Sequence, residues 1–352
     1  MNMLKNLLLS IFFLFFLFCC KSIHNAKHSY ISSIQIDTLL VETISVRALD
    51  FDKSKVYYAA NKNRVGYIDL LSGNKFERTI SKDSLNIEFR SIAVTDDAVL
   101  VLSVANPALL YRFSKDLISK KLVYQENHEK VFYDGMKFWN NKQGIAIGDP
   151  IDGAFSILTT NDSGLTWTKS SVTISPKASD GEAIFAASNS NLISKEHQLW
   201  FVTGGKSARV FCSSDNGKSW SDYPTPIVQG KTMTGIFTAD FYDKNIGVIA
   251  GGDYDIPNQN FSNKAITSNG GKKWKLIADN KAFGYASCIQ FVPGSNGFSL
   301  ISVGASGVFY SNDKGTSWTQ LSKDSSLYTI RFLDSYTAIA AGKNKIIRIK
   351  LR

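Results

Sequence analysis

Short apolar runs that end at a small residue recur from about residue 45 to the C-terminus. Each unit has one apolar run, a turn, a second run that ends at glycine, and a third run that leads into a polar turn. The second runs are residues 144–148, 199–204, 247–251, 300–304 and 337–342. Runs of this length, rich in β-branched and aromatic residues and separated by Gly, Asn, Asp and Ser, predict strands. The pattern therefore predicts an all-β protein built from repeated units.

Four of the polar turns share a sequence: an Asp or Asn, a glycine two residues later, and a tryptophan three residues after the glycine. They span residues 160–167, 213–220, 267–274 and 311–318. The Asp or Asn can accept hydrogen bonds from turn amides, the glycine supplies a positive φ, and the tryptophan can pack between sheets. The residues assigned to these structural turns are Asp162, Trp167, Asp215, Trp220, Asn269, Trp274, Asp313 and Trp318.

These segments resemble the Asp-box, or BNR repeat, of sialidase-like β-propellers, which implies that each turn closes one blade. Two earlier units, 46–80 and 89–124, keep the apolar pattern, and the second has a degenerate box at 114–116. The last unit, 327–351, has room for three strands, and residues 33–42 are left over at the other end. We therefore expect a single seven-bladed β-propeller over residues 33–352, closed by an N-terminal strand that completes the last blade.

The N-terminus has the layout of an export signal. Lys5 is followed by an apolar segment at 7–18, interrupted only by Ser10, and then by Cys19 and Cys20. A charged start, a short apolar segment and a small-residue exit are typical of a secretory signal. The apolar segment is shorter than the about 20 residues that a membrane span needs.

Residues 17–20 resemble a bacterial lipoprotein processing site, which implies that Cys20 is acylated. We expect a signal peptide at 1–19, the acylated cysteine and a polar tether at 20–32, and an exported protein anchored to a membrane of the cell envelope, on the periplasmic or outer-membrane side. An ordinary cleaved signal and an uncleaved anchor are the alternatives.

The composition of the chain argues against several classes of function. The net charge is +10, but the basic residues are scattered, and no run of them suggests a nucleic-acid partner. The four histidines lack metal-ligand spacing, and no glycine-rich dinucleotide motif is present. Cys212 and Cys288 fall in different repeats and are expected to be buried thiols. The sequence therefore predicts no metal and no cofactor.

The box turns also give the propeller two different faces. In blades that run from inside to outside, the boxes lie at the third hairpin of each blade. The opposite face collects the start of each inner strand and the loop between the second and third strands. Functional side chains are expected there, on loops that a rigid scaffold holds.

One residue of each inner strand is expected at the mouth of a central funnel on this face. Aligning the strands on a small residue followed by an apolar one gives Arg47, Arg90, Asp134, Glu182, Phe237, Ser287 and Tyr328. With the neighbouring loops, the candidate ligand-binding funnel is Arg47, Arg90, Asp134, Asp149, Asp152, Glu182, Asp253, Tyr254, Tyr285 and Ser287. The alternative is that these residues form structural ion pairs and cap turns.

Stretches outside the boxes carry a narrower resemblance, which extends from residue 45 to the C-terminus. Residues 89–92, 132–139, 148–155, 181–188, 225–228 and 251–254 resemble a family of bacterial propellers related to the photosystem II assembly and stability factor. Bacteroidetes members often carry the label oxidoreductase. Ala286, where relatives tend to have arginine, and Asn269 depart from the pattern. The resemblance implies a scaffold that holds partner proteins.

We therefore expect a monomeric, envelope-anchored scaffold that binds a protein, peptide or glycan through the face opposite the boxes. The first alternative is a sialidase-like glycoside hydrolase that uses Glu182, Asp134, Arg47 and Arg90, although a sialidase needs a larger arginine cluster. The second is an oxidoreductase, which rests on the family label alone. Whether the chain is an enzyme stays open, and no catalytic residue is assigned.

Overall fold

The computed structural model describes residues 31–352 except residue 83. These residues form one compact unit whose regular secondary structure is entirely β-strand. The predicted signal peptide, Cys20 and nearly all of the tether lie outside the described residues. Within the described range, no helix is long and apolar enough to cross a membrane.

Four of the sheets have four strands each. They are β5 (Phe89–Val94), β6 (Val99–Ser103), β7 (Ala108–Phe113) and β8 (Lys120–Glu126); β9 (Tyr133–Phe138), β10 (Gly144–Ile151), β11 (Ala154–Thr160) and β12 (Thr168–Lys169); β14 (Leu192–Lys195), β15 (Gln198–Val202), β17 (Arg209–Ser213) and β18 (Ser221–Pro224); β23 (Ala286–Phe291), β24 (Leu300–Gly304), β25 (Gly307–Ser311) and β26 (Thr319–Ser322).

Two further sheets have six strands each. In hydrogen-bonding order they are β27 (Leu327–Phe332), β28 (Thr337–Leu351), β1 (Ile34–Phe51), β2 (Lys55–Ala60), β3 (Arg64–Asp69) and β4 (Lys75–Thr79); and β13 (Glu182–Ala183), β16 (Gly204–Gly205), β19 (Thr234–Phe241), β20 (Gly247–Asp253), β21 (Lys264–Thr267) and β22 (Lys275–Leu276). All strand pairs within these sheets are antiparallel.

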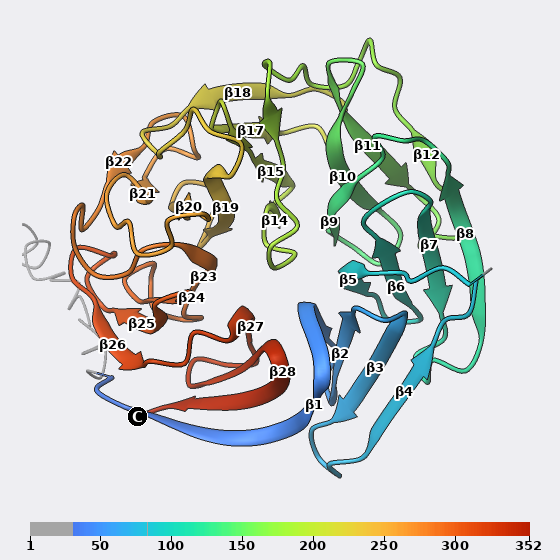
Figure 1. The fold of residues 1–352 in the computed structure, drawn as a ribbon, viewed down its shortest axis with the longest axis horizontal. Coiled ribbons are helices and arrows are strands. Elements are labelled where there is room, and N and C mark those ends of the chain that lie inside the picture. The colour runs from blue at the N-terminus through green and yellow to red at the C-terminus, as the bar shows by residue number, and fades with distance from the viewer. Residues whose placement is uncertain (1–30, 83) are drawn as a thin grey trace, which may run out of the picture. The chain divides into compact units, whose positions relative to one another are not determined.

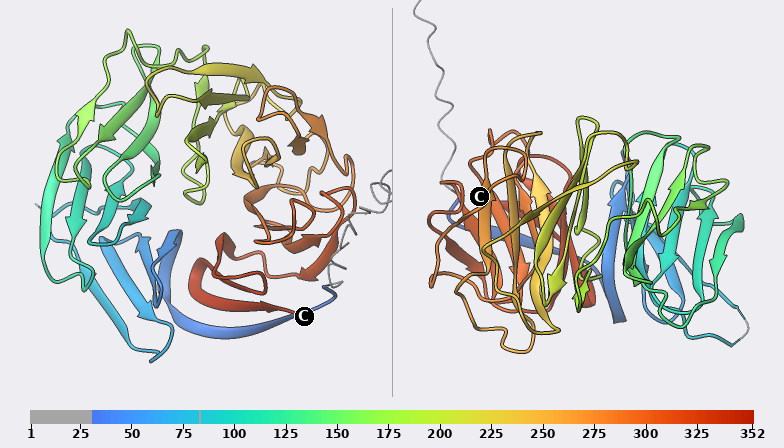
Figure 2. Two further views of the ribbon diagram at one scale, coloured as in Figure 1. Left: turned by 180° about the vertical axis from the view of Figure 1, so that it is seen from behind. Right: turned by 90° about the horizontal axis from the view of Figure 1, so that it is seen from above.

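The sheets stand around a central axis, as the face-on and edge-on views show (Figures 1 and 2). This confirms an all-β propeller, but the prediction of seven blades is wrong, because the described strands form six hydrogen-bonded sheets. The long strand β1 pairs with β28 from Ile34 to Ser45 and with β2 from Val46 to Phe51. One strand therefore belongs to two ladders and joins the first and last sequence units in one sheet.

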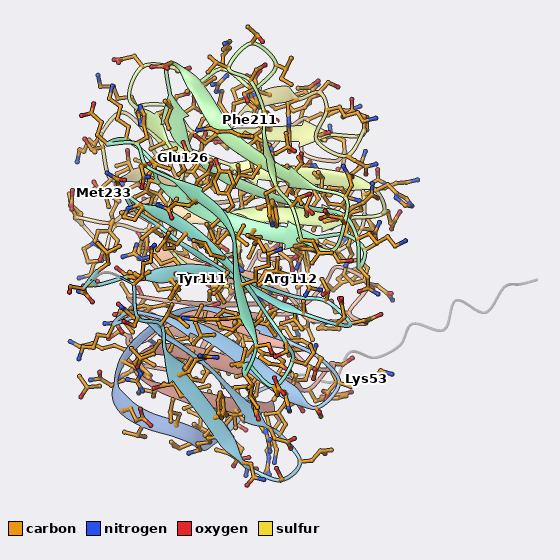
Figure 3. All side chains as sticks on the ribbon, turned by 90° about the vertical axis from the view of Figure 1, so that its right-hand side faces the viewer. Lys53, Tyr111, Arg112, Glu126, Phe211 and Met233 are labelled. Atoms are coloured by element: carbon orange, nitrogen blue, oxygen red, sulfur yellow. The ribbon has the colours of Figure 1, made fainter. Side chains whose placement is uncertain are left out.

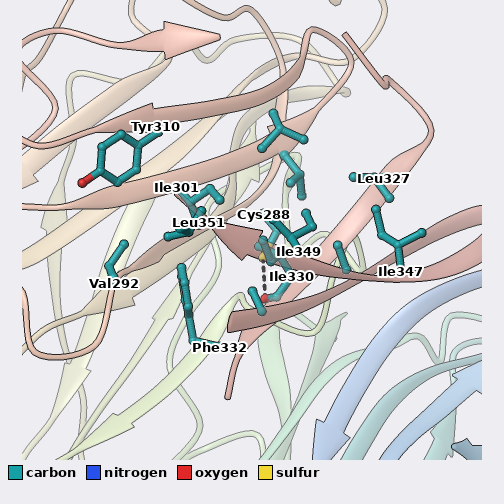
Figure 4. Close-up of a cluster of buried hydrophobic side chains, with 14 of the residues drawn as sticks. Cys288, Val292, Ile301, Tyr310, Leu327, Ile330, Phe332, Ile347, Ile349 and Leu351 are labelled. Atoms are coloured by element: carbon teal, nitrogen blue, oxygen red, sulfur yellow. Dashed lines mark hydrogen bonds between the residues drawn. The ribbon is translucent and has the colours of Figure 1, made fainter. Parts of the chain in front are cut away.

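The apolar core lies in layers between neighbouring sheets. Figure 4 shows the layer between β23–β25 and β27–β28, where Cys288, Ile301, Ile330 and Ile349 are fully buried. Each box tryptophan belongs to such a layer, between its own sheet and the preceding one. Because large aromatic side chains bury much apolar surface, these residues hold adjacent sheets together.

Hydrogen bonds close each box turn in the same way. In the second box, Asp215 Oδ1 accepts the amides of Lys218 (3.0 Å) and Ser219 (2.9 Å), and Oδ2 accepts the Ser219 hydroxyl. Gly217 has a φ of 82°, a conformation that glycine adopts without strain. Asn269 accepts the Lys273 amide at 2.9 Å in the third box. A side-chain oxygen at this position is therefore sufficient to close the turn.

Asp215→Ala should lower the free energy of unfolding by about 1–3 kcal/mol, because it leaves turn donors without their acceptor. Asp215→Asn should cost less than half as much, since it keeps the oxygen that Asn269 provides in the third box. Urea denaturation of both variants measures the difference. Equal losses would show that the side-chain oxygen does not stabilise the turn.

The difference between wild type and Asp215→Asn should also depend on pH. Burial opposes ionisation of Asp215, but hydrogen bonds from the Ser219 hydroxyl and amide lower its pKa to about 2. A lowered folded-state pKa gives stability that is lost as pH falls through it. The difference should therefore shrink between about pH 4 and pH 2.

Candidate functional site

Six of the aligned inner-strand residues share one backbone feature. Each is the residue that the register skips where its inner strand pairs with the next strand. The six are Arg47, Arg90, Asp134, Phe237, Ser287 and Tyr328. A β-bulge leaves one residue unpaired in the ladder and redirects its side chain. The fold thus repeats one bulge at the start of six inner strands.

Glu182, the seventh aligned residue, is held differently. Its strand β13 has two residues and pairs without a bulge. Its fully buried carboxylate accepts hydrogen bonds from Arg209, the Thr203 hydroxyl (2.6 Å) and the Ser179 amide (2.8 Å). The structure therefore places Glu182 in a buried ion pair with Arg209. Its carboxylate has no free acceptor position for the proton transfer or nucleophile activation that a hydrolase requires.

The axis of the ring is occupied by residues 185–191, which we call the central segment. It leads into β14 and enters the middle of the ring in Figure 1. Its Ala187 carbonyl accepts Arg47 of β1 at 3.1 Å, and the Asn189 amide group donates to Ile92 of β5 at 2.9 Å. Ser190 bonds to Thr238 of β19 at 2.7 Å. Side chains from opposite sides of the ring are therefore joined through this segment.

Two adjacent cavities open above the central segment. The first, about 440 Å³, is lined by Arg47 and Arg90, by Asp149, and by an apolar floor that includes Phe185 and Phe237. The second, about 280 Å³, shares Arg47, Tyr254 and Tyr285 with the first and adds Ser287 and Tyr328. Together they form the funnel. Met233 of its rim and Lys53 of the β1–β2 hairpin lie at opposite faces of the molecule (Figure 3).

Aromatic contacts stiffen the wall between the two cavities. Phe185 of the central segment stacks on Phe237, with ring centroids 4.0 Å apart. Tyr285 packs edge-to-face on Phe237 at 4.8 Å and on Tyr254 at 5.2 Å. Paired rings in these geometries stabilise the fold by more than the burial of their apolar surface alone. The wall is therefore a preformed apolar surface.

The two arginines keep part of their binding capacity. The Arg47 guanidinium lies over the Tyr328 ring at 4.1 Å. Arg90 pairs with Glu88 at 2.9 Å, and its side chain is 26% exposed. A guanidinium has five N–H donors, so each can still donate to a ligand in the first cavity. The rim therefore favours an anionic group.

Asp134 and Asp149 form a pair of carboxyl groups beside this rim. Asp134 is 0% exposed, and neither of its carboxyl oxygens meets hydrogen-bond geometry with a described residue, although the backbone amides of Ala186 and Asp149 lie close enough to lower its pKa slightly. Burial, and then the charge of Asp149, raise the pKa of Asp134 well above its usual range, against the opposing effect of Arg90. Burial raises the pKa of Asp149 to about 6, although Asp149 accepts the Ile184 amide at 2.8 Å.

The other two predicted carboxyl groups of the funnel, Asp152 and Asp253, lie in loops that they help to shape. Asp152 and Gly153 form the tip of the β10–β11 hairpin, with φ values of 54° and 75°, as a tight hairpin turn requires. Asp253 accepts Lys231 (3.0 Å) and the amides of Asp255 and Ile256. Although burial opposes ionisation, these bonds lower the pKa of Asp253. Both residues therefore shape loops of the funnel face.

Sequence reasoning missed the central segment and, apart from Phe237, the apolar floor. Residues 188–191 are Ser-Asn-Ser-Asn, which indicates a surface turn by composition. Phe132, Phe185 and Met233 line the first cavity but stand between strands in the sequence pattern. No local signal separates them from other apolar residues. Among the described residues, no group of three His, Cys, Asp or Glu side chains could hold a metal ion.

Comparison with known proteins identifies the fold but not the family. No family model and no curated protein matches the chain. A structure described as YCF48 bound to D1 peptide aligns with a TM-score of 0.64 and 14% identity, over 92% of this chain and 100% of that chain. YCF48 from Cyanidioschyzon merolae gives 0.62 and 12%, over 91% and 99%. A streptogramin B lyase structure gives 0.66 and 13%, over 91% and 98%.

At these identities the likeness shows the fold alone. The solved structures that resemble this chain include photosystem II assembly-factor propellers, so the resemblance found in the sequence is confirmed at the level of the propeller fold.

Asp134→Asn should stabilise the protein at pH 8, raising its melting temperature by a few degrees. Because the pKa of Asp134 is raised in the folded state, the wild type loses stability as pH rises. An asparagine at this position cannot ionise and therefore avoids this loss. The gain should shrink as pH falls towards the ordinary range of an aspartate, because protonation removes the buried charge from the wild type. Thermal melts over this range test the expectation, with Asp152→Asn at the exposed hairpin tip as the control. A gain that does not depend on pH would contradict it.

Proposed function

We propose that the protein is a binding or assembly scaffold that holds a peptide segment of a partner protein in the funnel opposite the box turns. The observation that carries the proposal is the first cavity, in which two arginines stand at the rim of a preformed apolar floor. Arginines and aromatic residues are the usual anchors of peptide and protein interfaces. The expected ligand has an acidic group next to an apolar side chain.

The rigidity of the funnel supports this function. The central segment closes its base, and bulged inner strands hold Arg47 and Arg90. A preformed site does not have to order its side chains when it binds, so more of the contact energy appears as affinity. The YCF48 structure described as bound to D1 peptide adds support, since a propeller of similar fold holds a peptide.

The location of the scaffold is also part of the proposal. Acylation of Cys20 would anchor the propeller, as a monomer, to a membrane of the cell envelope, and the partner would be an envelope protein. A glycan is the alternative ligand, because sugars also stack on aromatic rings. The arginine pair favours a peptide, since it offers guanidinium groups that match a carboxylate.

The double variant Arg47→Ala/Arg90→Ala should lose at least about tenfold in affinity for the partner, because two anchors of the acidic group are removed. The partner is first captured from native envelope and identified, and its affinity is then measured by calorimetry. Arg112→Ala is the matched control, since Arg112 lies on β7 and bonds to Asp97 and Ser163 (Figure 3). Unchanged affinity in the double variant would refute the assignment.

Binding of an acidic peptide should strengthen as pH falls from 8 to 5.5. Asp149 lines the same cavity as the arginines and has a pKa of about 6, so protonation removes a negative charge that repels the ligand. Peptide carboxylates stay largely ionised over this range. Asp149→Asn should lose most of this pH dependence, and what remains should come from Asp134, the other carboxyl group with a raised pKa beside the rim. A variant with the wild-type pH dependence would show that Asp149 is not the responsible group.

A further inference from the structure

The second cavity has a lining of its own. Three tyrosines, Tyr254, Tyr285 and Tyr328, and Pro257 form its walls, while Gly304 and Ala305 leave space between them. Tyr254 is 44% exposed, although it belongs to the aromatic wall. The positive charge of Arg47, which borders both cavities, is partly engaged by the face of the Tyr328 ring. The cavity is therefore mainly an aromatic slot beside the anion-binding rim.

Ser287 provides a polar group in this slot without a partner. Its residue is 1% exposed, and its hydroxyl oxygen has no hydrogen-bond partner among the described residues. The Tyr285 hydroxyl lies close to it, and this weak contact opposes the rise that burial causes in the pKa of Tyr285, but the two groups do not meet hydrogen-bond geometry. Leaving a buried hydroxyl unpaired costs free energy. A ligand group that donates to it or accepts from it would recover that cost.

We propose that the second cavity is a subsite for an aromatic side chain with a polar tip, a tyrosine or tryptophan of the bound peptide. The ring lies against the tyrosine walls, and its O–H or N–H reaches Ser287 Oγ. This inference rests on the proposed peptide-binding function and adds a specificity rule. Because the two cavities share Arg47, Tyr254 and Tyr285, the aromatic residue stands close to the acidic group in the peptide.

Small residues leave room in the slot for an aromatic ring. A Cβ on Gly304 would lie 2.5 Å from the Tyr285 carbonyl oxygen, so the backbone approaches too closely there for a side chain. Ala305 also lines the cavity, and a larger side chain at this position would occupy the space of the ligand ring. Ala305→Phe therefore tests occupancy of the slot, while Ser287→Ala tests its polar contact.

The probes are N-acetyltyrosinamide, N-acetylphenylalaninamide and N-acetylleucinamide, titrated into the protein and followed by NMR. Wild type should bind the tyrosine probe about fivefold more tightly than the phenylalanine probe, and the leucine probe most weakly. Ser287→Ala should remove the tyrosine preference and keep phenylalanine binding. Ala305→Phe should abolish binding of both aromatic probes. Leu71→Phe, at an exposed residue of the β3–β4 turn that lines neither cavity, should leave them unchanged.

Equal affinities for all three probes, or a tyrosine preference that survives in Ser287→Ala, would overturn the subsite. So would binding of methyl glycosides that Ala305→Phe abolishes, because the slot would then take a sugar. Thermal melts confirm that each variant is folded, and Ala305→Phe tests the slot independently of Ser287. If the probes do not bind, while Arg47→Ala/Arg90→Ala still lowers the affinity for the partner, only the subsite is refuted. If the probes bind but Arg47→Ala/Arg90→Ala leaves the affinity for the partner unchanged, the proposed function is refuted.

Discussion

The structure depends on the hydrogen bonds that the central segment makes at the axis of the ring. Inner strands converge there without pairing with one another, and their bulges leave polar groups outside the ladders. The Ser188 carbonyl accepts the Thr329 hydroxyl at 3.2 Å and Arg331 at 2.9 Å, and the Ser188 hydroxyl donates to the Ser287 carbonyl at 2.7 Å. Because unpaired polar groups are costly when buried, the hydrogen bonds of this segment stabilise the inner strands that meet around the axis.

The same contacts explain why small residues recur on the inner strands. The residue after each bulge is small: Ala48, Ser91, Gly135, Thr238, Cys288 and Thr329. A Cβ on Gly135 would lie 2.4 Å from Asn191 Oδ1 of the central segment, so even a methyl group does not fit there. The hydroxyls of Thr238 and Thr329 bond to the segment instead. At Gly135, Thr238 and Thr329, the small residue that aligned the strands in the sequence is thus a packing requirement at the axis.

Local features were predictable from the sequence, and long-range pairing was not. The strands, the box turns and the alignment of the inner-strand residues follow from short patterns of apolar, small and turn-forming residues. The six-sheet arrangement depends on one strand, β1, that continues without a break from its ladder with β28, about 300 positions away, into its ladder with β2, and no local pattern reveals this continuity. Glu182 has the same local sequence pattern as its counterparts, but Arg209, 27 residues later, holds its carboxylate. Asp134 was predicted at the funnel, but its complete burial depends on the packing around it.

The two faces differ in electrostatics as well as in shape. Asp215 on the box face has a lowered pKa because hydrogen bonds from the turn outweigh its burial. Asp134 and Asp149 on the funnel face have raised pKa values because burial removes hydration without equivalent compensation. Groups that are left poorly satisfied reduce stability and persist only where the rest of the fold offsets them. The box turns thus stabilise one face, while the rim of the funnel keeps two buried carboxyl groups whose lost hydration the fold does not fully replace.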